Sequence, residues 1–226
     1  WRRNKGRCNG SLWWQYNDCW GAPSWSSVDF FGKWKPLMYA SREFNQPFTI
    51  SFEDKKNSVA IYVLNDTLKK KPCTLKFSIY DFDGNKLLSK NVEIRSKANT
   101  SKKAVEIPVS AFDKKRCFIK GSLICGGSTV AERTKVLLPE RKLKLKKANI
   151  KCTVINNEII LESDTFARQV FVDIKGVNVP LSENCFDLLP NRKKIIRLSD
   201  NGIINPDDVT VKCVNNISCK GSSLGR

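Results

Sequence analysis

The reactive side chains of this sequence are few, and histidine is absent altogether. The lack of histidine excludes histidine-activated nucleophiles and removes the commonest metal ligand. None of the nine cysteines forms a Cys-x-x-Cys pair, so a zinc ribbon is not expected. We expect disulfides or buried thiols, with at least one cysteine unpaired because the count is odd, and we expect no metal and no cofactor. The cysteines are Cys8, Cys19, Cys73, Cys117, Cys125, Cys152, Cys185, Cys213 and Cys219.

Tryptophan is concentrated at the start of the chain, where all six indoles lie between residues 1 and 34. Indole rings stack on the flat C–H faces of sugars, and neighbouring polar groups fix the hydroxyls. A dense run of this kind therefore indicates a carbohydrate site. The competing interpretation is that these rings only fill the space between packed domains.

The elements around the tryptophans form a predicted βα unit over residues 1–46. Residues 11–17 are a strand-like aromatic run, and a polar loop follows from 18 to 32. Pro36 opens a helical pattern that stops before Pro47. A single βα unit cannot bury both faces of its strand, so it belongs to a larger parallel barrel or packs against the next domain.

The rest of the chain shows a mainly β pattern with an apolar period of two. Residues 47–138 predict seven short strands in an immunoglobulin-like sandwich. The basic segment 139–148 is a linker or a first strand, and six further strands predict a second, smaller sandwich over 139–226. The Gly/Ser-rich tail at 220–226 is expected to be mobile. The predicted strands of the second sandwich are 150–155, 158–162, 169–174, 185–188, 193–198 and 209–214.

The tryptophan-rich segment resembles the last strand, loop and helix of the catalytic (β/α)8 barrel of glycoside hydrolase family 2, in its β-mannosidase branch. That family carries G-x-L-x-W-Q-x-N-D-x-W, then S-W-S-x-x-[DE] and G-x-W-K, which match residues 10–20, 24–29 and 32–35 in order. Residues 184–190 (N-C-F-D-L-L-P) resemble the N-x-F-x-L-x-P stretch of the final sandwich in the same enzymes. The resemblance implies the C-terminal portion of such an enzyme: two immunoglobulin-like sandwiches preceded by the terminal βα unit of the barrel.

Barrel enzymes place substrate-binding residues at the C-terminal ends of strands and in the loops that follow them. The resemblance puts five residues at such a place, and we expect them to contact the sugar: Trp14, Asn17, Asp18, Trp20 and Trp25. Asp18 is equally well interpreted as a buried hydrogen-bond acceptor. Alternation along the strand puts Trp13 on the opposite side from Trp14, facing the helix layer.

No catalytic residue is assigned within this chain. A retaining glycosidase needs two carboxyl groups about 5–5.5 Å apart, and the resemblance implies two glutamates on barrel strands that precede Trp1. The acids of the barrel-like segment are Asp18, Asp29 and Glu43, and Glu43 falls on the helix, away from the catalytic face of a barrel.

The resemblance thus implies part of a retaining exo-β-mannosidase that hydrolyses terminal non-reducing β-D-mannose, with the mannoside bound through the missing barrel. The alternatives are an exo-β-glucosaminidase of the same family and a non-catalytic carbohydrate-binding or structural sandwich module. The formal charge of +18 also permits a polyanion binder, but the lysines scatter and form no nucleic-acid motif. We expect neither nucleic acid nor a membrane as partner, and the oligomeric state stays open.

Four Asn-x-Ser/Thr sequons, together with the cysteine count, favour a secretory route to the lysosome or the cell exterior. The candidate glycosylation sites are Asn9, Asn65, Asn99 and Asn216.

Overall fold

The computed structural model describes residues 1–8, 10–200 and 202–217. It divides into two compact units, Trp1–Lys144 and Leu145–Arg226. The division lies within the basic segment that the sequence marked as a linker or first strand. A finer boundary at residue 46 stays a prediction, and the predictions for Asn9, Cys219 and the tail fall outside the described residues.

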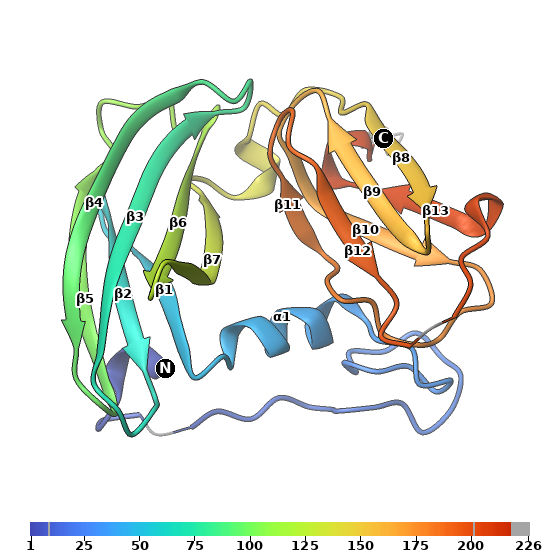
Figure 1. The fold of residues 1–226 in the computed structure, drawn as a ribbon, viewed down its shortest axis with the longest axis horizontal. Coiled ribbons are helices and arrows are strands. Elements are labelled where there is room, and N and C mark those ends of the chain that lie inside the picture. The colour runs from blue at the N-terminus through green and yellow to red at the C-terminus, as the bar shows by residue number, and fades with distance from the viewer. Residues whose placement is uncertain (9, 201, 218–226) are drawn as a thin grey trace, which may run out of the picture. The chain divides into compact units, whose positions relative to one another are not determined.

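The first unit contains the expected sandwich of seven strands, all paired antiparallel. One sheet has the order β1-β2-β5 and the other has the order β4-β3-β6-β7 (Figure 1). The prediction of seven strands between residues 47 and 138 is confirmed. The strands are β1 (Phe48–Asp54), β2 (Ser58–Asn65), β3 (Lys71–Asp81), β4 (Lys86–Ser96), β5 (Thr100–Pro108), β6 (Cys117–Cys125) and β7 (Ser128–Val136).

The core of this sandwich follows from the alternation that the sequence shows in β3. Leu75, Phe77 and Ile79 are 0–2% exposed and point inward, whereas Lys76 between them points to solvent. Leu75 lies opposite Leu123 of β6, which is also fully buried. Each such side chain contributes about 1.5–3 kcal/mol by leaving water, so these inward faces hold the two sheets together.

A close approach between the sheets explains the glycine in the middle of β6. A Cβ placed on Gly121 would lie 2.7 Å from Cδ1 of Ile50 and 3.2 Å from the ring of Phe52, both on β1. A glycine inside a strand often marks such a contact. Gly121 therefore lets the side chains of β1 enter the core at this point.

The segment before the sandwich contains one turn of 3-10 helix, η1 (Arg2–Asn4), and one α-helix, α1 (Pro36–Phe44). The helix matches its prediction, and Pro36 occupies the first turn, where no backbone donor is needed. The N-terminal arm is fixed to β1 because Arg3 donates to the Ser51 hydroxyl and to the Phe52 carbonyl, each at 2.8 Å. The end of α1 is fixed to β7 by an ion pair between Glu43 and Arg133.

The strand predicted for residues 11–17 does not form. Within the described part of the chain, residues 11–16 pair with no strand, and only Asn17 makes an isolated parallel bridge, to Val28. A strand of a parallel barrel requires a hydrogen-bonded strand on each edge, and the described residues form no strand beside this run. The assignment of residues 1–46 to a barrel unit is therefore not established by the fold.

The second unit is a smaller, all-antiparallel arrangement of six strands in two sheets, with orders β12-β9-β8 and β11-β10-β13. All six predicted strands are present, with their ends shifted by up to two residues. Asn156 and Asn157 both have positive φ, as expected for the tight turn between β8 and β9. The elements are β8 (Ile150–Ile155), β9 (Glu158–Ser163), β10 (Ala167–Ile174), β11 (Phe186–Leu188), β12 (Lys194–Arg197) and β13 (Val209–Lys212), with short 3-10 turns η2 (Glu140–Lys142) in the first unit and η3 (Pro206–Asp208) and η4 (Val214–Asn216) in the second.

Replacing Leu75 with alanine should lower the free energy of unfolding of the first unit by about 2–5 kcal/mol, because it leaves a cavity among buried neighbours. Leu68→Ala is the matched control, since Leu68 is 91% exposed and its loss should change stability by about 0.5 kcal/mol at most. Urea unfolding followed by circular dichroism measures both values. Equal effects of the two substitutions would contradict the assigned core.

Candidate functional site

The loop that carries the tryptophans is shaped by backbone hydrogen bonds around Ser27 and Val28. The amides of Ser27 and Val28 donate to the Tyr16 carbonyl at 3.0 and 2.9 Å, and the Ser27 hydroxyl donates to the same oxygen at 2.6 Å. The amide of Asp18 donates to the Val28 carbonyl at 3.1 Å, and the amide of Lys35 donates to the Ser27 carbonyl at 2.9 Å. These bonds bring residues 15–18, 27–28 and 35 together although no regular strand forms.

Asp18 is the buried charged group at the centre of this loop. Its side chain is 5% exposed and forms an ion pair with Lys35, with Oδ2 and Nζ 2.7 Å apart. The Ser24 hydroxyl donates to the other carboxylate oxygen, and Lys35 also donates to the Ser26 hydroxyl at 2.7 Å. The hydrogen bond from Lys35, followed by that from Ser24, lowers the pKa of Asp18 below its ordinary value of 3.8.

These contacts favour the interpretation of Asp18 as a buried hydrogen-bond acceptor, and its contact with a sugar stays a prediction. Both oxygens of its carboxylate already accept hydrogen bonds from the protein. Sequence reasoning did not single out Ser24, Ser26 and Lys35, although all three lie in motifs quoted for the family resemblance. The sequence could have indicated them, because the two serines of S-W-S and the lysine of G-x-W-K can donate hydrogen bonds to a buried carboxylate.

The other two acids of the segment also serve structural contacts. One carboxylate oxygen of Asp29 accepts hydrogen bonds from the amides of Phe31 and Lys33, at 2.9 and 2.8 Å, and so closes a turn. Glu43 pairs with Arg133. No catalytic role is therefore assigned to these carboxylates.

The remaining predicted sugar contacts lie exposed along the loop. Trp14, Trp20 and Trp25 are 76%, 71% and 68% exposed. Asn17 is also exposed, and its amide nitrogen donates to the carbonyl of Asp18 at 3.1 Å. The structure places these residues on one hydrogen-bonded loop, but it does not enclose them in a cavity.

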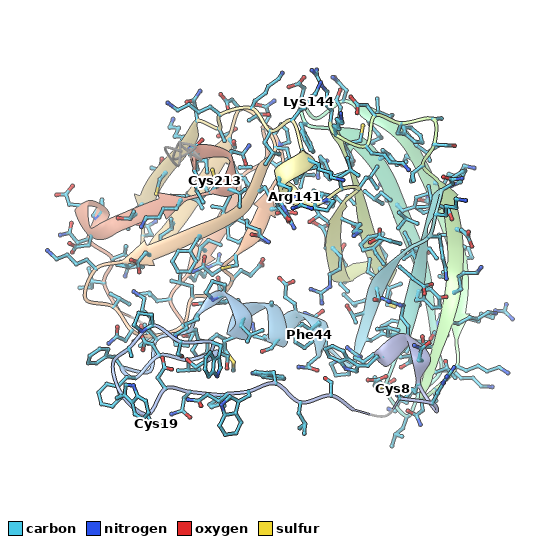
Figure 2. The ribbon with its side chains drawn as sticks, turned by 180° about the vertical axis from the view of Figure 1, so that it is seen from behind. Cys8, Cys19, Phe44, Arg141, Lys144 and Cys213 are labelled. Carbon is cyan, nitrogen blue, oxygen red and sulfur yellow. The ribbon has the colours of Figure 1, made fainter. Side chains whose placement is uncertain are left out.

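Trp13 differs from its neighbour Trp14 in its environment. Its ring packs edge-on against Phe44, with ring centroids 6.3 Å apart. Phe44 lies at the C-terminal end of α1 (Figure 2). Trp13 is 39% exposed, about half as much as Trp14. This contact agrees with the predicted orientation of Trp13 towards the helix, and the sugar contact of Trp14 stays a prediction.

A cavity of about 450 Å³ lies elsewhere in the first unit, beside Trp1, Phe44 and Phe52. Arg3 and Arg133 line it, but their guanidinium groups already donate to protein oxygens. It contains none of the five predicted sugar contacts. We therefore do not assign it as the substrate site.

The four predicted glycosylation sites differ in accessibility. Asn65 is fully buried, and its amide nitrogen donates to the carbonyls of Lys69 and Lys97 at 3.0 and 2.9 Å. Burial and these two hydrogen bonds leave no room for a glycan on this nitrogen in the folded unit, which disfavours Asn65 as a glycosylation site. Asn99 is exposed in a turn with positive φ.

Asn216 is exposed, but both polar atoms of its amide bond the backbone of Ala148. A glycan at Asn216 would therefore compete with a contact that fixes the end of the second unit. Asn9 lies outside the described residues, which leaves Asn99 as the best placed of the described sequons.

A backbone hydrogen bond joins two basic segments of the first unit. The amide of Lys144 donates to the Lys115 carbonyl at 2.8 Å, which joins the turn at 113–116 to the segment that also carries Arg141 (Figure 2). The basic side chains at this junction are Lys114, Lys115, Arg116, Arg141, Lys142 and Lys144.

Residues 1–8, 10–200 and 202–217 contain neither a membrane-spanning helix nor a metal-binding cluster. No helix in these ranges is long and apolar enough to cross a membrane. No group of three or more acidic or cysteine side chains there is arranged to hold a metal ion.

Lowering the pH should loosen the tryptophan loop because Asp18 has a depressed pKa. The ion pair with Lys35 stabilises the loop above about pH 3.8, the ordinary pKa of an aspartate, and this contribution is lost as the pH falls through the lower folded-state value. Tryptophan fluorescence between pH 7 and pH 2 should show an acid step in the wild-type chain. Asp18→Asn should shift the emission at pH 7 and lack that step.

Asp54→Asn is the control for this experiment, because Asp54 has a side chain that is 65% exposed and pairs with Lys135 outside the loop. It should keep the wild-type acid profile. An unchanged profile in Asp18→Asn would show that the carboxylate does not hold the loop.

Family models match both sandwiches. A model described as a mannosidase Ig/CBM-like domain matches residues 57–141, and one described as an Ig-fold domain matches residues 141–217. The two matched regions meet at residue 141, close to the division between the compact units. The mainly β architecture with immunoglobulin-like domains is therefore shown by sequence family and by structure.

Relatives of the chain are β-mannosidases, of which it spans only a small part. The rat (Rattus norvegicus) β-mannosidase is 34% identical over 116 residues, which cover 50% of this chain and 13% of the relative. The bovine (Bos taurus) β-mannosidase is 54% identical over 52 residues, covering 23% of this chain and 6% of the relative.

Solved structures give the same relationship over a longer stretch. The β-D-mannosidase from Dictyoglomus thermophilum superposes with a TM-score of 0.80 and 27% identity, covering 95% of this chain and 27% of that one. The exo-chitosanase from Amycolatopsis orientalis superposes with a TM-score of 0.66 at 16% identity, over 86% of this chain and 29% of that one, which supports the fold alone. With both domain models and the β-mannosidase relatives in agreement, this chain belongs to the β-mannosidases of glycoside hydrolase family 2 and corresponds to their C-terminal portion.

Proposed function

We propose that this chain is the C-terminal part of a retaining exo-β-mannosidase, which releases terminal β-D-mannose from the non-reducing end of its substrate. The observation that carries the proposal is the loop at residues 10–35. There, Trp14, Trp20 and Trp25 are largely exposed on a backbone fixed around Asp18, in a chain whose relatives are β-mannosidases.

Exposed indoles on a well-bonded loop suit the recognition of a sugar. Three large aromatic side chains left in water lose the stabilisation that burial would give them. A sugar ring that stacks on one of them restores part of it, and the exposed Asn17 amide is placed to bond a hydroxyl. In this proposal Trp14, Asn17, Trp20 and Trp25 form one side of the mannose pocket.

The remaining parts of the catalytic site lie outside this chain in our proposal. Residues 1–46 are the last βα unit of a (β/α)8 barrel, whose earlier strands carry the two glutamates of a retaining mechanism. One glutamate attacks the anomeric carbon and the other protonates the leaving oxygen. The two sandwiches then serve as accessory domains, and the first of them fixes the end of the barrel through the Glu43–Arg133 pair at the end of α1.

Two alternatives remain distinct from this proposal. An exo-β-glucosaminidase would share the fold, as the exo-chitosanase structure does, but that structure is 16% identical to this chain whereas the β-mannosidase structure is 27% identical. A non-catalytic carbohydrate-binding or structural module would bind sugars or partners without any upstream glutamates.

In the whole enzyme, Trp14→Ala should lower kcat/KM for an aryl β-mannoside at least about tenfold, equivalent to about 1.4 kcal/mol of transition-state binding. Trp13→Ala should instead lower stability by roughly 1–3 kcal/mol, since its ring packs against Phe44 but stays partly exposed. Steady-state kinetics and thermal unfolding of both variants separate the two roles.

The chain alone is the negative control for these assays and should give no turnover, because it lacks the paired glutamates. Turnover by the purified chain that disappears on mutating Asp29 would refute the missing-carboxylate argument. Unchanged kinetics in Trp14→Ala would remove Trp14 from the pocket.

We also propose a secretory route for the protein, ending in the lysosome or outside the cell. The chain secreted from a eukaryotic host should then carry a glycan on Asn99, which is exposed, and none on Asn65, which is buried and hydrogen-bonded. Peptide mapping after enzymatic deglycosylation in heavy-oxygen water identifies each modified asparagine. A glycan on Asn65 in folded protein would contradict the structure, and an unmodified Asn99 would count against the route.

A further inference from the structure

Two cysteines on neighbouring strands of the first sandwich face each other. The antiparallel register of β3 and β6 pairs Leu75 with Leu123 and continues to Thr74 with Ile124. One step further along the same ladder, Cys73 lies opposite Cys125. Side chains two residues apart on a strand share a face, so both thiols lie on the inner face that Leu75 and Leu123 occupy.

Burial agrees with this placement. Cys73 is 5% exposed and belongs to the core cluster of the first unit, and Cys125 is a partly buried side chain packed against the same cluster. Residues directly opposite each other in an antiparallel pair have Cα atoms about 4.5–5.5 Å apart. Disulfides span Cα separations of about 4.4–6.8 Å, so the register alone brings this pair within reach of a bond.

We propose that Cys73 and Cys125 form a cross-strand disulfide that ties β3 to β6 under oxidising conditions. The bond would close a loop that contains β4 and β5, so it restricts the unfolded chain over much of the sandwich. The inference is independent of the proposed catalytic function.

The other cysteines described on strands lack such a partner. Cys117 at the opposite end of β6 faces Asp81, and Cys152 on β8 faces Leu161. Of the cysteines outside the strands, Cys213 is buried in the second unit (Figure 2). Among residues 1–8, 10–200 and 202–217, the register therefore aligns one pair of cysteines.

The bond forms by exchange with a small disulfide such as oxidised glutathione. The Cys125 thiolate attacks one glutathione sulfur and releases one glutathione thiol, which leaves a mixed disulfide on Cys125. Cys73 then loses its proton and displaces the second glutathione. Two protein thiols are oxidised to one disulfide, and one glutathione disulfide is reduced to two thiols.

The order of these steps follows from the surroundings of the two thiols. Cys125 is partly exposed, whereas burial, with a smaller effect from Cys125, raises the pKa of Cys73 to about 12. The thiolate is the attacking species, so Cys73 reacts slowly near neutral pH. Closure should accelerate about tenfold per pH unit while the pH stays below the pKa of Cys73.

Incubating the full chain with oxidised glutathione tests the inference without any substitution. Alkylation of free thiols, followed by proteolysis and mass spectrometry, should recover a peptide pair linked through Cys73 and Cys125. The melting temperature of the first unit should rise by roughly 5–10 °C and return to its starting value on reduction. Both thiols alkylated in the oxidised sample, or Cys73 linked to another cysteine, would overturn the inference.

Three variants check the roles of the individual thiols. Cys73→Ser should stop the reaction at a stable glutathione adduct on Cys125, and Cys125→Ser should leave Cys73 unmodified because it is buried. Cys117→Ser is the matched control, since Cys117 is also buried on β6 and should keep the full rise in melting temperature. If only Cys117→Ser abolished the linked peptide, the disulfide would involve Cys117, and the proposed pair would be wrong.

Discussion

The close packing of two antiparallel sheets in the first unit is the constraint on which the other features of that unit depend. Large buried side chains on β3 and β6, such as Leu75 and Leu123, fill the space between the sheets. Gly121, opposite Phe77, has no side chain and so leaves room for the side chains of the facing sheet. Because this core is a closely packed cluster of buried apolar side chains, displacing any strand exposes a continuous apolar face. The N-terminal arm and α1 are then held against a rigid surface through Arg3 and the Glu43–Arg133 pair.

The tryptophan loop depends on a different kind of interaction. It has almost no regular secondary structure, and its shape is set by hydrogen bonds to Asp18, Ser27 and Val28. A buried carboxylate with an ammonium partner and two hydroxyls nearby is tolerated because its oxygens are satisfied. The polar centre fixes the backbone, so the large indoles need not pack together to define its path.

The separation of exposed indoles from a buried polar centre is consistent with the proposal that this chain contributes only part of a sugar-binding site. The side chains proposed to contact sugar are exposed, while those that fix the loop are buried. A glycoside hydrolase barrel builds its pocket from loops after several strands, so each loop contributes only a few groups. In the function proposed above, this chain contributes aromatic surface and one amide, and the ionisable catalytic groups are supplied by other strands.

Local patterns along the sequence predicted most elements correctly. The alternation of β3, the Asn156–Asn157 turn and the Pro36 helix start each depend on neighbours in the chain, and each has the predicted form. The motif from Gly10 to Trp20 indicated the family for a similar reason, because residue types at fixed spacing survive without the fold. The strand predicted within the same motif is a loop in the structure, because strand formation depends on pairing partners outside the local run.

Other outcomes required the tertiary structure because they depend on residues far apart in sequence. The Asn65 sequon is intact in sequence, yet Lys97 from a different strand connection covers its amide. The sequence fits Asp18 equally well as a sugar ligand or as a buried acceptor, and only the fold shows that Lys35 Nζ lies 2.7 Å from its carboxylate. Nine cysteines allow many pairings, and only the register of β3 against β6 sets Cys73 opposite Cys125.

The sequence by itself determined the elements and the family, because periodicity and motif spacing are local. The fold alone decided which polar groups are buried and which thiols meet, because burial and pairing are properties of contacts between distant segments.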